Sequence, residues 1–535
     1  MTARRLLVAA CTVPALVAPV LAAAPQAAAQ PGLRWGPCPV DAHVTAAPAR
    51  CATLSVPMDY TRPTGRRISI MISRIPAENQ AGKLGVLFGN PGGPGGDGLD
   101  YWSARRQSLP ARLHREFDEI AVQPRGLRWS TPLNCAAPGA GLVSAVSGAP
   151  LVVGGRGVCE AHDPSYPRTV TTENTARDMD QVRRALGVSK ISYLGGSYGT
   201  YLGAVYATLF PAHTDKLVLD SNVHPDWIWQ REFVEQQLGR KRRLEDMFDW
   251  IAAHNRVYRL GGSRAVVAAE WARQVGMQGG GAFARLDPGI AAPGNPLDPV
   301  LADIVANRFR LSREQLGRLA NIVRTLTEPT AGGGSMTFKA TTMATYARKT
   351  WPYLAQGMRE YRDNPRNLRF LRFLSGMDGL SAPSRRWVFT AITCNENDNR
   401  PDPDAMAAAL GGFLTGAGVF DITAALLRTG VGCSGWEQSA IPVHVSGRAL
   451  AVPPMLLQSE HDSATVAAGG PAMAAAMRGR LVRVAGGDHG LVGRGDRTLD
   501  QAVLNYLETG RITITHADQA PIPVPDPPRV LPKSQ

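Results

Sequence analysis

The sequence predicts an α/β fold, a mostly parallel β-sheet flanked by helices and interrupted by a large helical insertion. Three observations lead to this prediction. Short β-branched or apolar runs alternate with segments of helical periodicity in the first part of the chain, which is the rhythm of βαβ units. This rhythm stops near residue 221 and resumes after residue 445. The stretch between consists of amphipathic segments and Gly/Pro-rich loops, and it holds seven of the ten tryptophans.

The composition is that of a globular protein. Of 535 residues, 44% are hydrophobic and 19% are charged, which is too apolar for a disordered chain and too evenly mixed for a multi-span membrane protein. The 58 basic and 44 acidic residues give a net charge of +14, but the arginines are scattered and do not interleave with aromatic residues. We therefore expect no nucleic-acid partner.

Residues 1–29 have the pattern of a cleaved signal peptide. Arg4 and Arg5 precede an apolar stretch, and three alanines stand before Gln30. We expect secretion, and no stable membrane insertion, because no later apolar segment approaches the roughly 20 residues of a membrane span. An uncleaved anchor and lipidation at Cys11 are the alternatives. Prolines interrupt the apolar stretch, and the run before Cys11 is short for a lipoprotein signal.

The cysteines agree with export. Cys11 leaves with the leader, so six of the seven cysteines remain in the mature chain. An even number of cysteines in an exported chain indicates disulfides. No C-x-x-C motif or Cys/His cluster favours a metal site. Six cysteines allow about fifteen pairings, and we predict that each pairs with its nearest neighbour in sequence. The predicted disulfides are Cys38–Cys51, Cys135–Cys159 and Cys394–Cys433.

The expected elements follow in order along the chain. The predicted strands are residues 68–75, 84–88, 119–123, 190–194 and 216–220 before the insertion, and 454–458 and 480–484 after it. The predicted helices of the core are residues 176–186, 200–210 and 499–507. We therefore divide the mature chain into a core of residues 30–220 and 446–512, a mainly helical cap insertion of residues 221–445, and an extended Pro-rich tail of residues 513–535.

The strongest chemical signal is the segment 195–199, which fits the pattern G-x-S-x-G around Ser197. Residues 191–194 before it favour a strand, and residues 200–210 after it favour a helix. This is the strand, sharp turn and helix that present a nucleophilic serine. Glycines two residues before and after the serine relieve crowding in such a turn. A Gly-rich βα turn with an incidental serine is the alternative.

A serine hydroxyl needs a base, and the base needs a carboxylate that fixes its tautomer. In the chain order serine, acid, histidine, both partners are expected at the ends of later strands. Asp462 follows the strand 454–458, and His489 follows the strand 480–484. We predict a Ser197, Asp462 and His489 triad. Asp220 is the alternative acid because it also ends a strand.

Backbone N–H groups are expected to stabilise the oxyanion that forms when serine attacks a carbonyl. One should come from Tyr198, and the second from Gly92 or Gly93 in the loop after strand 84–88. A rival interpretation takes residues 93–98 as a dinucleotide-binding loop, but a proline inside the turn argues against it. The predicted chemistry calls for no metal and no organic cofactor.

Five parts of the chain together match a known family pattern: residues 90–95, 124–126, 171–199 and 391–394, and the end that holds Asp462 and His489. They resemble the secreted tripeptidyl aminopeptidases of actinobacteria, in the proline iminopeptidase-like branch of the α/β-hydrolases (serine peptidase family S33). The resemblance implies an α/β-hydrolase fold, a helical cap over the site, and cap carboxylates that bind the ammonium group of a free N-terminus. Glu396 is the candidate for that carboxylate and Asp398 a second one. A solvated acidic loop is the alternative for both.

Three positions depart from the resembled pattern. Gln123 stands where an aspartate usually precedes Pro-Arg-Gly, Asp97 replaces a small residue after the Gly-rich loop, and His461 precedes the predicted acid. These changes leave the triad intact but bear on substrate preference.

We expect an exported serine aminopeptidase that releases short peptides, and the resemblance implies tripeptides. An esterase or amidase acting on small secreted metabolites with the same triad is the main alternative, and a non-catalytic binding protein on the same scaffold is another. The expected partner is a peptide or small-molecule substrate, and the sequence leaves the oligomeric state open.

Overall fold

The structure is a computed structural model. It describes residues 32–135, 155–279, 335–377, 383–397 and 417–520, with short pieces at 139–140, 152–153, 284, 286, 404–405, 407–409, 522, 527–528 and 530–531. The predicted signal peptide and Asp398 lie outside the described residues.

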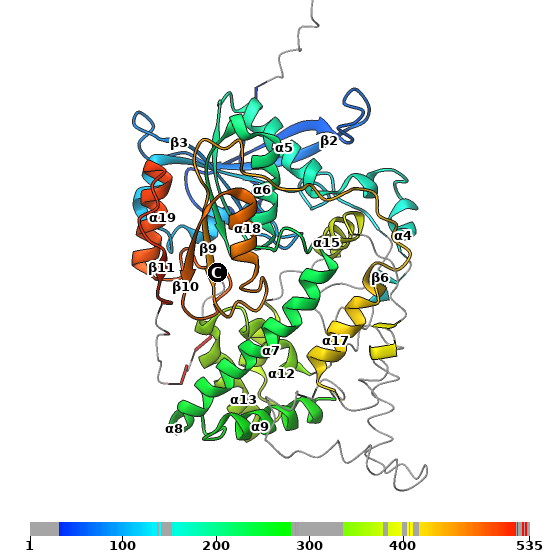
Figure 1. Ribbon diagram of the computed structural model, residues 1–535, viewed down its shortest axis with the longest axis vertical. Coiled ribbons are helices and arrows are strands. Elements are labelled where there is room, and N and C mark those ends of the chain that lie inside the picture. The colour runs from blue at the N-terminus through cyan, green and yellow to red at the C-terminus, as the bar shows by residue number, and fades with distance from the viewer. Residues whose placement is uncertain are drawn as a thin grey trace, which may run out of the picture. The chain divides into compact units, whose positions relative to one another are not determined.

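A nine-stranded sheet carries the fold (Figure 1). Its strand order is β1-β2-β4-β3-β7-β8-β9-β10-β11; β2 is antiparallel to β1 and β4, and all strands from β4 to β11 are parallel. The strands are β1 (Arg50–Pro57), β2 (Arg67–Ile75), β3 (Gly85–Asn90), β4 (Phe117–Val122), β7 (Ile191–Gly196), β8 (Thr214–Asp220), β9 (Met455–Ser459), β10 (Arg480–Val484) and β11 (His516–Ala517). A separate pair joins β5 (Gly139–Ala140) to β6 (Val152–Val153).

The predicted fold class is confirmed, and every predicted strand is present within two residues at either end. Two strands of the nine-stranded sheet, β1 and β11, and the short pair of β5 with β6 were not predicted. In β1, buried and exposed residues are mixed and the strand ends in a proline, so no apolar run marks it. The two residues of β11 fall in the segment for which we expected an extended tail, and they pair with β10.

Helices cover both faces of the sheet because neighbouring strand residues point to opposite sides. On one face, Phe88 of β3 belongs to a hydrophobic core with residues of α5, α6 and α18. On the other, Leu87 packs with residues of α1, α2 and α19. These helices are α1 (Tyr101–Arg105), α2 (Ala111–Glu116), α5 (Thr172–Ala185), α6 (Tyr198–Leu209), α18 (Gly469–Met477) and α19 (Arg497–Thr509). Shorter elements are α4 (Gly157–Glu160), η1 (Val40–Ala42), η2 (Tyr166–Thr169) and η3 (Pro211–His213).

Local sequence sets the ends of α5, the helix nearest to the site described below. Its N-cap Thr171 accepts a hydrogen bond from the N–H of Asn174 through its side chain. Gly187, just beyond the helix, has a φ of 70°, a conformation that favours glycine and stops a helix. The predicted helix at 176–186 thus begins one turn earlier, at Thr172.

A buried ion pair fixes α5 to the neighbouring loops. Arg125 of the Pro-Arg-Gly segment donates to both carboxylate oxygens of Asp178 on α5, at 2.7 and 2.8 Å. It also donates to the carbonyl oxygens of Met58 and Thr169, at 2.7 and 3.1 Å. Because neither charged side chain is exposed, losing one partner would leave an unpaired buried charge. Arg125 therefore holds the residues that precede α5 in place.

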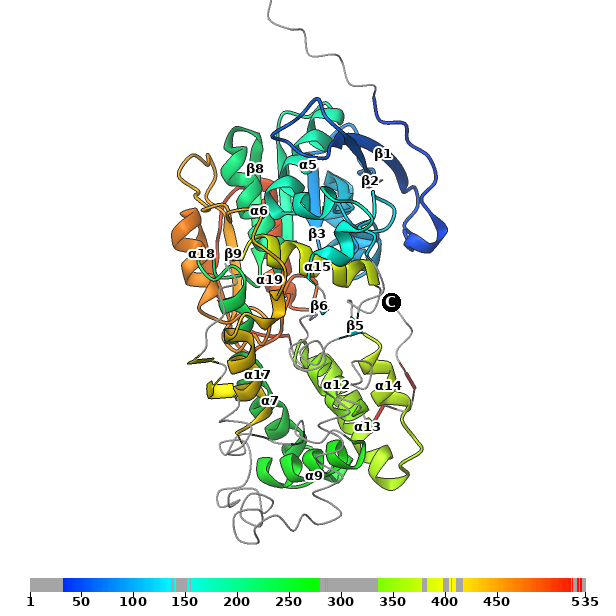
Figure 2. The same cartoon turned by 90° about the vertical axis from the view of Figure 1, so that its right-hand side faces the viewer.

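The insertion runs between the neighbouring strands β8 and β9 and has a hydrophobic core of its own. Its helices are α7 (Gln230–Ala253), α8 (Asn255–Tyr258), α9 (Arg264–Met277), α12 (Met336–Ala344), α13 (Trp351–Asp363), α14 (Arg369–Ser375), α15 (Pro383–Asn395) and α17 (Val419–Arg428), with the short η6 (Arg348–Thr350) and η7 (Val431–Cys433). In Figure 2, α15 lies beside the sheet and α6, whereas α12, α13 and α14 form a separate group. Among the described helices, none is long and apolar enough to cross a membrane.

Candidate active site

Ser197 occupies a strained turn between β7 and α6. Its φ of 57° and ψ of −129° lie outside the regions that side chains favour. The flanking glycines are required, because a Cβ on Gly195 would come within 2.5 Å of the Gly199 carbonyl oxygen. The Ser197 N–H donates to the main-chain oxygen of Asp220 at 2.9 Å. The turn therefore places the serine at the carboxyl end of the sheet, where α/β proteins bind their ligands.

Asp462 and His489 are brought together at the same edge of the sheet. Both oxygens of the Asp462 carboxylate lie 3.0 Å from Nδ1 of His489. The carboxylate also accepts the N–H groups of Ala464 and Thr465 at 2.8 and 3.0 Å, and its side chain is fully buried. Because Nδ1 faces the carboxylate, Nε2 is the imidazole nitrogen available to accept a proton.

Asp220, the alternative acid, is occupied elsewhere. Its carboxylate accepts the N–H groups of Leu491 and Val492, at 2.8 to 2.9 Å, just after His489. Its main-chain oxygen accepts the N–H of Ser197. Asp220 therefore ties the turn that carries the serine to the loop that carries the histidine, and it makes no described contact with the imidazole.

The Gly-rich loop after β3 lies against the serine turn. A Cβ on Gly92, whose φ is 96°, would be 2.8 Å from Cβ of Ser197 and 3.2 Å from the backbone nitrogen of Tyr198. The N–H of Gly92 donates to Oδ1 of Asn90 at 2.9 Å. The N–H of Gly93 has no partner among the described residues. Of the two glycines predicted as the second oxyanion donor, Gly93 is therefore the one whose N–H is available.

Glu396 follows α15 and is buried next to the serine turn. Its carboxylate accepts the backbone N–H of Thr172, the Thr172 hydroxyl at 3.0 Å and the Trp229 indole N–H at 2.9 Å. The Thr172 hydroxyl also lies 3.0 Å from the Tyr198 hydroxyl. Burial raises the pKa of Glu396 to about 7, although these hydrogen bonds oppose the rise. Only the side chain of Thr172 therefore separates the buried Glu396 carboxylate from the side chain of Tyr198, the residue after Ser197. Glu396 is not in a solvated loop.

A second buried carboxylate, Glu232 near the start of α7, was missed by the sequence analysis. The side chain accepts the N–H of His224 at 3.3 Å, and the residue is 4% exposed. Burial raises the pKa of Glu232 to about 8, and the negative charge of Asp462 contributes to the rise. Glutamates on amphipathic helices are normally exposed, and only the neighbouring tryptophans at 227 and 229 hinted that this turn is buried.

The cap contacts the loops that carry His489 and Asp462. The carbonyl oxygen of Tyr346 accepts the N–H of His489 at 2.8 Å, and the tyrosine ring meets the imidazole edge to face with centroids 5.5 Å apart. Arg243 of α7 donates to the carboxylate of Asp488 at 2.7 Å. His461, the atypical residue before the acid, pairs with Asp246 of α7 at 2.9 Å. Residues of the insertion therefore help to hold the imidazole in place.

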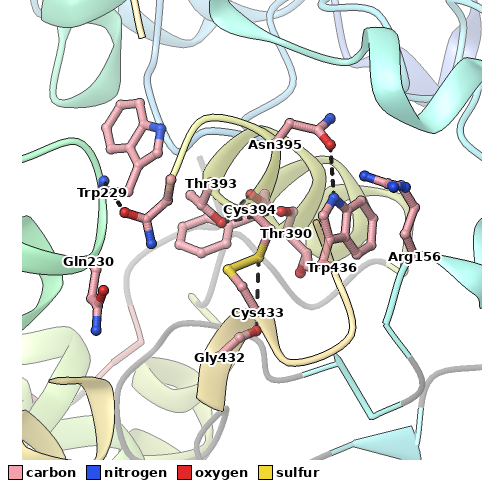
Figure 3. Close-up of a disulfide and its surroundings, with 12 residues drawn as sticks. Arg156, Trp229, Gln230, Thr390, Thr393, Cys394, Asn395, Gly432, Cys433 and Trp436 are labelled. Carbon is pink, nitrogen blue, oxygen red and sulfur yellow. Dashed lines mark hydrogen bonds between the residues drawn. A yellow bond between two sulfur atoms is a disulfide. The ribbon is translucent and has the colours of Figure 1, made fainter. Parts of the chain in front are cut away.

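Three disulfides have the pairing that the sequence spacing favoured, Cys38–Cys51, Cys135–Cys159 and Cys394–Cys433. The third joins the end of α15 to η7, as Figure 3 shows. Next to it, the Asn395 side chain accepts the Trp436 indole N–H at 2.8 Å and donates to the carbonyl oxygen of Pro167 at 2.7 Å. This disulfide and Asn395 therefore anchor the segment that presents Glu396.

Comparison with known proteins identifies two family regions. Residues 86–257 match the alpha/beta hydrolase fold model, and residues 419–518 match the model described as TAP-like protein. The tripeptidyl aminopeptidase of Streptomyces lividans is 37% identical over 263 residues, which are 46% of this chain and 48% of that protein. The matched region thus spans about half the length of that relative.

Two relatives align over most of the chain. The serine protease Hip1 of Mycobacterium tuberculosis is 29% identical over 510 residues, 89% of each protein. Carboxylesterase B of the same organism is 27% identical over 506 residues, 88% of this chain and 86% of its own. Together with the two family regions, these similarities agree with the observed sheet and its helical insertion. The chain therefore has the α/β-hydrolase fold and is similar to tripeptidyl aminopeptidases.

Proposed function

We propose that this chain is an exported serine peptidase that removes short peptides, tripeptides in the main case, from the free N-terminus of its substrate. The observation that carries the proposal is the hydrogen-bonded His489 and Asp462 pair at the sheet edge that also holds the strained Ser197 turn. Similarity to the Streptomyces tripeptidyl aminopeptidase and to Hip1 supports peptide hydrolysis. The three disulfides and the signal-like leader support export.

The proposed reaction is acyl transfer. The Ser197 hydroxyl attacks the scissile carbonyl while Nε2 of His489 takes the hydroxyl proton. The imidazolium, oriented by Asp462, then gives that proton to the leaving amine, and an acyl-enzyme remains on Ser197. Water, deprotonated in the same way, releases the peptide acid and restores the serine.

The oxyanion of each tetrahedral intermediate would be held by the N–H groups of Tyr198 and Gly93. The sequence also predicts Gly92 as this donor, but its N–H donates to the Asn90 side chain. The bond from Gly92 to Asn90 would instead hold the loop in position. Loss of one such donor typically raises the barrier by about 3 kcal/mol.

Recognition of a free N-terminus is assigned to Glu396, with Glu232 as a second acidic group. An ammonium ion brought into a buried site needs a carboxylate partner, because an unpaired buried charge is strongly unfavourable. The Thr172 hydroxyl contacts both the Glu396 carboxylate and the Tyr198 side chain, and Tyr198 is the residue that follows Ser197. Asp398, the other predicted residue, stays a prediction because it lies outside the described residues.

A second candidate function is hydrolysis of small esters, favoured by the similarity to carboxylesterase B. The same triad would cleave an ester, with an alcohol in place of the leaving amine. In that case the buried glutamates would serve only to hold the cap against the core.

The deciding experiment is an assay of the purified mature protein on aminoacyl-, dipeptidyl- and tripeptidyl-anilides beside p-nitrophenyl esters. We expect turnover of the tripeptidyl-anilide that N-acetylation of the substrate abolishes, and none from the Ser197→Ala variant. Ester turnover alone would favour the second candidate. A wild-type protein that neither turns over any substrate nor reacts with a fluorophosphonate at Ser197 would show that the chain is not a serine hydrolase.

A further inference from the structure

A buried polar cluster follows the Gly-rich loop. Its centre is Asp97, whose side chain is only 4% exposed. Oδ1 of Asp97 accepts a hydrogen bond from the side-chain amide of Gln123 at 2.7 Å. Oδ2 accepts from the guanidinium groups of Arg128, at 3.1 and 3.2 Å, and of Arg385, at 2.5 and 3.1 Å. One carboxylate therefore joins three separate segments of the chain.

Two of the three positions that depart from the resembled pattern, Asp97 and Gln123, contact each other in this cluster. Gln123 directly follows β4, and its side-chain oxygen accepts the N–H of Gly98 at 2.7 Å while its amide donates to Asp97. Its amide also donates to the carbonyl oxygen of Arg128 at 2.9 Å. The amide of Gln123 is thus fully used, and the two residues act as one unit that fixes the end of the Gly-rich loop.

The same cluster reaches the cap through Arg385 on α15. The loop and this helix meet backbone to backbone, since a Cβ on Gly95, whose φ is 93°, would lie 2.5 Å from the Arg385 carbonyl oxygen. A Cβ on Gly98 would likewise lie 2.6 Å from the Val122 carbonyl oxygen. The loop is therefore packed between β4 and α15, and the ion pair of Asp97 with Arg385 crosses that contact.

The cluster around Asp97 connects the proposed oxyanion donor with the proposed ammonium acceptor. Gly93, the proposed oxyanion donor, lies four residues before Asp97 in the same loop. Glu396, the proposed ammonium acceptor, directly follows the helix that carries Arg385. Loosening the cluster would let the loop and the helix shift against each other, and misplacement of reacting groups by about 1 Å can cost about a hundredfold in rate.

We propose that Asp97 is a positioning residue of the active site: its carboxylate holds the Gly-rich loop and α15 in one arrangement, and so sets the place of the oxyanion donor relative to Glu396. The proposal rests on the function proposed above. Asp97 touches neither the substrate nor the reacting atoms, and it acts through the backbone of the loop.

The test compares Asp97→Asn with wild type on a tripeptidyl-anilide and on p-nitrophenyl acetate. Turnover is divided by the number of active sites that a fluorophosphonate titrates. Because both substrates use the oxyanion donor, we expect kcat per titrated site to fall about tenfold to a hundredfold for both. The double variant Asp97→Asn/Gln123→Glu returns a carboxylate to the cluster and should regain part of the loss. If Asp97→Asn does not fold, Arg385→Gln, with a side chain 24% exposed, provides the same measurement.

Asp118→Asn is the matched control. Asp118 is also a buried carboxylate, 3% exposed, that accepts bonds from two cations, Arg74 at 2.8 Å and Lys83 at 2.6 Å, but it lies at the start of β4 and not at its end. Its substitution should lower stability without changing kcat per titrated site. A normal kcat per titrated site in Asp97→Asn or in Arg385→Gln would overturn the positioning role. An inactive wild-type protein would instead refute the proposed function.

Discussion

Substitution of Glu396 by glutamine should remove a pH dependence that is specific to free-amine substrates. The pKa of about 7 means that the carboxylate is about 3% ionised at pH 5.5 and about three-quarters ionised at pH 7.5. If the ionised form binds the substrate's ammonium group, kcat/KM for a tripeptidyl-anilide should rise about twentyfold over this interval. Above pH 8 it should fall again, because the peptide's own amine, with a pKa near 8, loses its proton.

The assay measures kcat/KM from pH 5.5 to 9 for the tripeptidyl-anilide and for p-nitrophenyl acetate. Dividing the first profile by the second removes the pH dependence that both substrates share. In Glu396→Gln this ratio should lose its rise near pH 7 and fall about ten- to a hundredfold at pH 7.5, the cost of a hydrogen bond to a charged group. Glu173→Gln, a half-exposed carboxylate in the first turn of α5, should keep the rise. An unchanged ratio profile in Glu396→Gln, or equal losses for both substrates, would refute the ammonium-binding role.

Three further predictions concern the fold and the site. The pKa of buried Glu232 is raised from 4.5 to about 8, so this group binds a proton in the folded protein but not in the unfolded chain between these values. Glu232 therefore makes the unfolding free energy fall as pH rises through this window, by up to about 1.4 kcal/mol per pH unit. Glu232→Gln should remove this share of the slope in urea titrations and leave the share that Glu396, with a pKa of about 7, contributes. Gly92→Ala should strongly lower kcat, since the added Cβ would lie 2.6 Å from the Gly196 carbonyl oxygen, whereas Gly36→Ala, with no atom within 4 Å, should leave kcat unchanged. Replacing Cys394 and Cys433 by serine opens a loop of 39 residues and should cost about 4 kcal/mol of stability by the chain-entropy relation. The replacement should also weaken the preference of the enzyme for free-amine over N-acetylated substrates. An unchanged preference would show that the position of Glu396 does not depend on the disulfide.

The sequence predicted the strands best where both faces of the sheet are buried. The strands β3, β4, β7, β8 and β9 are almost wholly buried, so continuous apolar runs marked them. The turn at Ser197 and the strand end before Asp462 could be placed from these runs, whereas β10, the strand before His489, is only partly buried. In contrast, β11 has two residues and depends on pairing with β10, which no local pattern encodes.

The sequence alone does not predict contacts between side chains that are far apart in the chain. Nothing in the motif distinguishes Gly92 from Gly93, because the choice depends on whether the Asn90 side chain folds back onto the loop. The burial of Glu232 depends on how the start of α7 packs against the turn at His224 and lies near Asp462. Asp97 and Gln123 were each noted as departures, but only folding brings them within a hydrogen bond of each other.

The insertion joins β8 to β9, two strands that are parallel neighbours in the sheet. A lid of another length or shape could connect the same two strands without moving either of them. On the function proposed above, bond cleavage would stay on the fixed sheet, and the exchangeable insertion would select the substrate. Lid grafts between related hydrolases at this junction offer a direct route to new specificities on an unchanged catalytic base.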